Sequence, residues 1–231
     1  MGSLWSFAAW GMNVIGPIVP PASNGHRFIL VAINYFTKWV EASTNKPVTK
    51  NVVVDFVHNN IVCWFGIPKS IITDNADNLN SDLTRETCER FKIAHKKSTV
   101  YQPKMNGAVK AANKNIKKIL RKIIDSHRQW YEKLPYALLG DRTTIRTSTR
   151  ATPYLLVYGT EAVIHADVEI PSLRIIQKIG LDDVEWICSR HEQLMLIDEK
   201  RMDIVCHGQL YLNRMTKAFN KKVKLRQFTP R

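Results

Sequence analysis

Phe28-Ile-Leu-Val-Ala-Ile33 is a continuous apolar run of the length of one β-strand, and the fold prediction starts there. A strand without polar residues suits the interior of a sheet that is covered on both faces. The proline-rich segment before it, with Asn24 and Gly25, predicts a turn that follows an earlier strand. Tyr35 to Ala42 is rich in aromatic and β-branched residues, and this composition predicts a third strand.

The following residues alternate between helical and strand patterns. Apolar residues from Val52 to Phe65 recur at helical spacing, so we expect a helix that begins after Thr49 and ends at Gly66. We expect a short strand over 69–73, a helix over 81–90 and another strand over 91–95. This order is typical of an α/β protein. Asp74 stands at the carboxyl end of the strand over 69–73, where open α/β sheets place functional residues.

Residues 104–128 predict an amphipathic helix with one apolar face and many cations on the other. We also expect helices over 130–139, after Thr152, and over 182–220. No acidic residue occurs between Arg90 and Ile124. The whole chain of 231 residues carries a formal net charge of +14, and its pI is about 9.7. A polyanion, above all nucleic acid, is therefore the expected partner.

Several classes of protein are disfavoured by the same sequence. No apolar run approaches the roughly 20 residues that a membrane helix needs. The first residues lack a basic segment typical of a signal peptide, so we expect a nuclear or cytoplasmic, intracellular protein. The four cysteines, Cys63, Cys88, Cys188 and Cys206, have the spacing of neither a zinc site nor a disulfide framework.

Five collinear blocks resemble the catalytic core of retroviral and gypsy-type LTR-retrotransposon integrases. They run from about Trp10 to Leu173, and the helical tail is similar to the segment that follows the core in plant elements. The blocks are Trp10-Gly-Met-Asn-Val-Ile-Gly-Pro17, Ile33-Asn-Tyr-Phe-Thr-Lys-Trp-Val-Glu-Ala42, Ile71-Ile-Thr-Asp-Asn75, Tyr101-Gln-Pro with Asn106-Gly and Ala112-Asn-Lys114, and Ala151-Thr-Pro-Tyr-Leu-Leu-Val-Tyr-Gly-Thr-Glu-Ala162.

The resemblance implies an α/β, ribonuclease-H-like fold: a five-stranded mixed sheet flanked by helices, with a helical C-terminal extension. It implies an integrase-like core over 1–165 and a basic helical extension over 166–231. It also implies DNA cleavage and strand transfer assisted by Mg²⁺ or Mn²⁺. The two-metal mechanism needs hard oxygen ligands that carry negative charge.

The family holds its metal ions with two Asp and one Glu, and this chain matches one of the three. Asp74 occupies the second position. The first metal-binding position is occupied by Asn13. In the family, 35 residues separate the second position from the third, and at this spacing after Asp74 the chain has Lys110. We therefore expect an inactive chain with no bound metal, or at most weak binding at Asp74.

The resemblance further assigns DNA contacts to Lys114 and Lys117, and places Tyr101 and Asn106 in a loop beside the family's active site. Arg121 extends the same basic helix face. Integrase cores dimerise, so a homodimer is expected from the resemblance.

Three functional hypotheses follow. The first is a retrotransposon integrase core that has lost catalysis. The second is an active enzyme with a rearranged site that uses Asp77, Asp82 or Glu86. The third is a repurposed nucleic-acid-binding or scaffolding protein with a vestigial pocket.

Overall fold

The computed structural model of the chain describes residues 7–98, 107–123, 128–163 and 182–221. These residues form two compact units. The first holds the described residues up to Thr144 and those from Thr152 to Ala162. The second holds Ile145–Ala151 and the described residues from Val163 onward.

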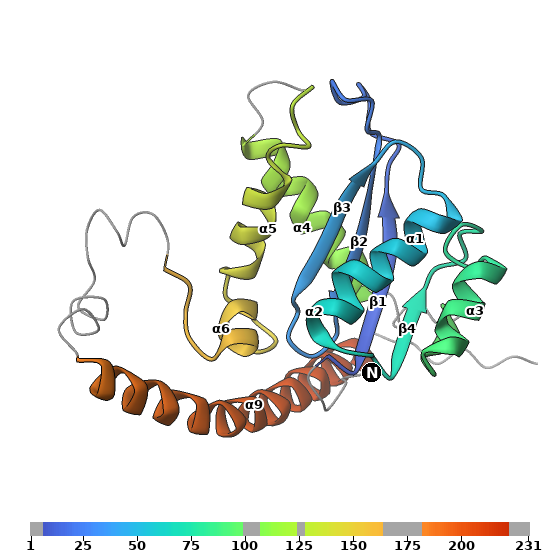
Figure 1. The fold of residues 1–231 in the computed structure, drawn as a ribbon. Coiled ribbons are helices and arrows are strands. Elements are labelled where there is room, and N and C mark those ends of the chain that lie inside the picture. Colours follow the sequence, from blue (N-terminus) through green and yellow to red (C-terminus); the bar gives the residue numbers. More distant parts are fainter. Residues whose placement is uncertain (1–6, 99–106, 124–127, 164–181, 222–231) are drawn as a thin grey trace, which may run out of the picture. The chain divides into compact units, whose positions relative to one another are not determined.

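The first unit is built on a mixed sheet whose five described strands lie in the order β3-β2-β1-β4-β5 (Figure 1). β1 pairs antiparallel with β2, and β2 with β3, whereas β4 is parallel to both β1 and β5. The strands are β1 (Ala9–Ile15), β2 (Phe28–Asn34), β3 (Val40–Asn45), β4 (Ser70–Thr73) and β5 (Ala94–Lys97). The predicted mixed sheet flanked by helices is thereby confirmed.

β2 explains why the sheet is covered on both faces. Ile29, Val31 and Ile33 point into one buried cluster, and Leu30 and Ala32 into another. Successive side chains of a strand alternate between the two faces, so an uninterrupted apolar strand needs cover on both.

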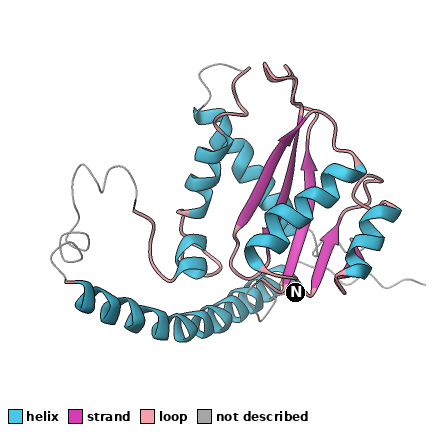
Figure 2. Cartoon of the chain, viewed as in Figure 1, coloured by secondary structure: helices cyan, strands magenta, loops and turns pink. Residues whose placement is uncertain are grey.

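Helices supply that cover from two sides (Figure 2). Residues of α4 and α5 share the cluster of Val31, whereas α1, the π-helical turn η1 and α3 share the cluster of Leu30. The helices of this unit are α1 (Lys50–Phe56), η1 (Val57–Val62), α2 (Cys63–Phe65), α3 (Asp82–Arg90), α4 (Gly107–Ile123), α5 (Leu134–Arg142) and α6 (Pro153–Tyr158).

Two predicted strands begin later than expected. Asn34 Oδ1 accepts hydrogen bonds from the backbone N–H groups of Phe36 (3.1 Å) and Thr37 (2.9 Å), so residues 35–37 form a turn before β3. β5 begins at Ala94 because Lys92, with a φ of 55°, terminates the α3 region. Local side-chain capping and a left-handed residue outweigh strand propensity at both places.

The second unit contains α9 (Asp183–Asn220), which confirms the predicted helix over 182–220. Asp182 and Glu185 form a reciprocal capping box, since Asp182 Oδ1 accepts from Glu185 N–H at 2.7 Å and Glu185 Oε2 from Asp182 N–H at 3.3 Å. Among the helices in the described ranges, none is both long and apolar enough to cross a membrane.

Candidate nucleic-acid interface

α4 exposes a face of lysine and arginine side chains because its apolar residues pack against the sheet. Val109, Ala112, Ile116 and Leu120 are buried at spacings of three and four residues. Buried residues at those spacings fix the orientation of a helix, and the remaining positions then face solvent. Lysine and arginine occupy most of these exposed positions.

Gly11 in the central strand β1 allows α4 to approach the sheet closely. A Cβ atom at this position would lie 2.5 Å from the Tyr35 hydroxyl oxygen and would also collide with a Val109 methyl group on α4. The absence of a side chain at Gly11 therefore allows the close packing of α4 against β1. Gly11 lies two residues before Asn13 on this strand.

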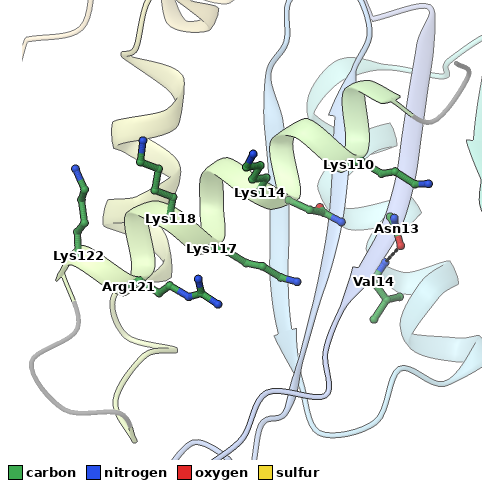
Figure 3. A pocket seen from close by; sticks show the side chains of 9 residues that line it. Asn13, Val14, Lys110, Lys114, Lys117, Lys118, Arg121 and Lys122 are labelled. Carbon is green, nitrogen blue, oxygen red and sulfur yellow. Dashed lines mark hydrogen bonds between the residues drawn. The ribbon is translucent and has the colours of Figure 1, made fainter. Parts of the chain in front are cut away.

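Between β1 and α4 lies a pocket of about 680 Å³ (Figure 3). Asn13 and Val14 line it from β1, and Lys110 and Lys117 point toward the strand from α4. Among the described residues, its lining includes six cations and no acidic side chain. From α4 the lining residues are Lys110, Asn113, Lys114, Lys117, Lys118, Arg121 and Lys122.

The six cations create a field that favours anions. All six are exposed, and none forms an ion pair with another described residue. Hydration and salt keep their mutual repulsion small, whereas a polyanion can contact several at once and release its condensed counterions. The chemistry available to this pocket is therefore phosphate binding.

Asn13 directs its side-chain oxygen toward its own strand. Asn13 Oδ1 accepts a hydrogen bond from the backbone N–H of Val14 at 2.6 Å. An amide oxygen carries no net charge, and this one already has a donor.

Asp74 follows directly after β4, the parallel neighbour of β1. Met12 of β1 pairs with Thr73, the last residue of β4, so Asp74 comes at the level of Asn13 but lies beyond the end of its own strand. Asp74 is not among the residues that line the pocket between β1 and α4. Its Oδ1 accepts from the Ala76 N–H at 3.2 Å, as in an Asx turn. The structure thus brings Asn13 and Lys110 into one pocket and places Asp74 in the adjoining turn.

A hydrogen-bond network that sequence analysis missed supports this turn. The buried Thr73 hydroxyl donates to Asn80 Oδ1 at 2.9 Å and lies 3.0 Å from His95 Nε2, which donates to it. Asn80 Nδ2 donates to the backbone carbonyl of Asp74. Burial, followed by the charges of Lys97 and Arg85, lowers the pKa of His95, so the neutral imidazole is favoured. Nothing in the sequence pattern indicated this contact, because it joins two strands and a loop.

The residues at the family's metal positions do not fit a two-metal site. These positions offer one carboxylate at Asp74 and one neutral amide at Asn13, whose oxygen already accepts a hydrogen bond from Val14 N–H. The third position holds the ammonium of Lys110, which cannot bind a metal ion. Mg²⁺ prefers several anionic oxygen ligands. Across the described ranges, no three or more His, Cys, Asp or Glu side chains gather as a metal-binding group.

Other predicted residues lie elsewhere. Tyr101 and Asn106 lie outside the described residues. Asp77 and Asp82 line a separate pocket of about 380 Å³ together with Lys50 and Lys97, and Glu86 is exposed on α3. None of these three carboxylates belongs to a group of three or more described side chains that could hold a metal ion.

Comparisons with known proteins connect this geometry to one group. No protein-family profile matches the chain. The chain is 31% identical over 139 residues to the Gag-Pol polyprotein of avian reticuloendotheliosis virus, 33% over 143 residues to that of woolly monkey sarcoma virus, and 32% over 143 residues to the Pol polyprotein of radiation murine leukemia virus. The chain is similar to retroviral Pol polyproteins.

These matches cover 60–61% of this chain but only 12%, 8% and 24% of the respective polyproteins. A solved structure of the simian T-cell lymphotropic virus intasome in complex with PP2A regulatory subunit B56 gamma contains a chain of similar fold. The TM-score is 0.57 at 20% identity, over 67% of this chain and 55% of that one. The predicted ribonuclease-H-like fold is therefore confirmed.

Proposed function

We propose that this chain is the integrase-like core of a gypsy-type LTR retrotransposon that binds DNA and has lost metal-dependent catalysis. The carrying observation is that Asn13 and Lys110 line one pocket. The resemblance assigns these two residues to two of the family's three carboxylate positions. The gypsy-type assignment rests on the five collinear sequence blocks and on the tail that is similar to plant elements.

The DNA-binding part of the proposal rests on the cations of α4. The basic stripe runs along α4 from Lys110 to Arg121. It is about 16 Å long, because an α-helix rises 1.5 Å per residue. A duplex presents one phosphate charge for each ~1.7 Å of its axis, so the stripe can meet several phosphates. Lysine and arginine contacts to phosphate carry little base specificity, and we expect weak sequence preference.

The loss of catalysis follows from charge. Replacing two carboxylates by an amide and an ammonium changes the formal charge of the three positions from −3 to 0. A cation at Lys110 repels metal ions, and no compensating acid lines the pocket among the described residues. We also propose, from the resemblance, a homodimer and a core that ends near residue 165.

Fluorescence anisotropy with a duplex of random sequence tests the binding function. We expect tight binding at about 50 mM salt and a loss of roughly 10³-fold by 200 mM if ~6 phosphates are neutralised. Affinity that does not change with salt, or no binding at low salt, would refute the proposed function.

A further inference from the structure

Another pocket, of about 400 Å³, lies at the end of β1 and shares residues with the basic pocket. It is lined by the end of β1 and the turn that follows, by Ile29 of β2, by α4 and by Trp130. Lys117 and Arg121 line both pockets, and the remaining lining residues of this one are glycine, proline and large apolar residues. We call it the apolar pocket.

The apolar pocket combines a buried apolar floor with a cationic rim. Ile29, Leu120 and Trp130 are buried, whereas Lys117 and Arg121 are exposed. The two cations are four residues apart on α4, so they are neighbours on one side of the helix. Their charge favours an anionic group at the mouth, while the floor favours an apolar or aromatic one.

The turn that walls the pocket is held in place by its backbone. The Ile18 N–H donates to the Arg27 carbonyl at 2.7 Å. Pro17 and Pro20 also line the pocket, and the proline ring fixes the backbone dihedral φ. A wall that is already ordered loses less conformational entropy when a ligand binds.

Trp130 brings a hydrogen-bond donor without an acceptor to this pocket. Its side chain is 2% exposed, and its indole Nε1–H is buried with no acceptor among the described residues. A buried donor that lacks an acceptor costs free energy, and the indole nitrogen can only donate. A ligand with a carbonyl oxygen or ring nitrogen can supply the missing acceptor.

We propose that the apolar pocket takes up one unpaired nucleobase of a bound DNA strand; this inference rests on the proposed DNA binding. The base contacts the indole of Trp130 and the aliphatic floor, and an acceptor of the base accepts from Trp130 Nε1–H. Lys117 and Arg121 hold the adjoining phosphates. A base within a duplex must first leave its stack, so the chain should prefer DNA with unpaired ends over blunt DNA.

Fluorescence anisotropy with three duplexes of one sequence tests the pocket in the full chain. One duplex is blunt, one has a 3′ overhang of two thymidines, and one has an overhang of two abasic sites. The abasic overhang carries the same phosphates, so the comparison separates the base from the counterion effect. The thymidine overhang should bind about tenfold tighter than the abasic one, because a base gains contact with the aromatic side chain and the apolar floor.

Two variants show whether the pocket provides this preference. Trp130→Phe keeps an aromatic ring but removes the donor, and Val19→Ser removes an exposed apolar wall; each should reduce the preference for thymidine severalfold. The matched control is Val163→Ser, an exposed valine outside the pocket, and it should leave the preference unchanged. Far-UV circular dichroism checks that the fold is retained.

Photocrosslinking locates the base directly. With 5-iodouracil in place of thymine in the overhang, peptide mass spectrometry should find the crosslink on Trp130 or on residues 15–20. Equal affinity for the thymidine and abasic overhangs, or a crosslink only elsewhere, refutes the pocket and leaves the proposed DNA binding intact. Failure to bind any of the three duplexes refutes both.

Discussion

Lys110 on α4 and Asn13 on β1 line the same pocket, and Gly11 lies two residues before Asn13 where α4 touches β1. An ammonium from the helix and an amide from the sheet thereby line the pocket between α4 and β1. Asp74 follows the neighbouring strand in register. This arrangement leads to predictions about metal binding, DNA binding and stability.

The first prediction concerns metal binding. The combined variant Asn13→Asp, Lys110→Glu should bind Mg²⁺ or Mn²⁺ in calorimetry, while each single variant should not. One substitution alone leaves either a missing carboxylate or the repelling cation. Strand-transfer assays should detect no activity in the unmutated chain or in either single variant. Mg²⁺ binding to the unmutated chain that is abolished by Asp74→Ala would contradict the loss of catalysis.

The second prediction concerns the basic stripe. Lys114→Glu with Lys117→Glu should weaken DNA binding and lower the slope of log affinity against log salt by about 2, since each lysine contributes about one phosphate contact. The matched control is Lys46→Glu with Lys69→Glu, an exposed pair outside the pocket with the same change in charge. Equal losses in the two double variants would show that net charge, and not the stripe, determines binding.

The third prediction concerns Gly11. Gly11→Ala should lower the free energy of unfolding by about 1–3 kcal/mol, because the new methyl group meets Val109 and the Tyr35 hydroxyl. Denaturant titration measures this change. Gly107→Ala, at a position with open space around it, serves as the control and should not destabilise the protein.

The fourth prediction concerns Arg142, which ties α5 to β3. Its guanidinium donates to the Val40 carbonyl at 2.8 and 3.1 Å and to Glu41 Oε1 at 2.8 Å, and lies 4.1 Å from the Trp39 ring centroid. Burial raises the pKa of Glu41, and the nearby Arg142 opposes that rise.

Arg142→Met should therefore lower the free energy of unfolding by about 3 kcal/mol, since it removes the cationic partner of a largely buried carboxyl. Denaturant melts of this variant and of the Arg142→Met, Glu41→Gln double variant measure the effect. The double variant should recover part of the loss, and equal melts would contradict the pairing.

The fifth prediction concerns pH. The pKa of His95 in the folded chain lies below its ordinary value of 6.5, so between these two pKa values the unfolded chain holds more protons. The free energy of unfolding should fall as the pH decreases from about 6.5 through the folded pKa. His95→Gln should reduce the difference in stability between pH 8 and pH 5, and an unchanged difference would rule out this role.

Much of the fold followed from local patterns. The apolar run in β2 predicted a strand covered on both faces, and the periodicity of α4 predicted its buried stripe and its cationic surface. Both properties depend on repeats of two or 3.6 residues, which adjacent residues determine. Strand starts were less predictable, because the Asn34 hydrogen bonds to the turn and the left-handed Lys92 override propensity.

By itself, the sequence determined the strand and helix periods, the excess of positive charge and the amide and lysine at positions 13 and 110. Tertiary structure alone decided that Asn13 and Lys110 share a pocket, that His95 meets Thr73, and that Cys63 lies beside His58. The first two contacts depend on strand register and on the close approach of α4 at Gly11. The third depends on the π-helical turn over Val57–Val62, and no local repeat of the sequence encodes these contacts.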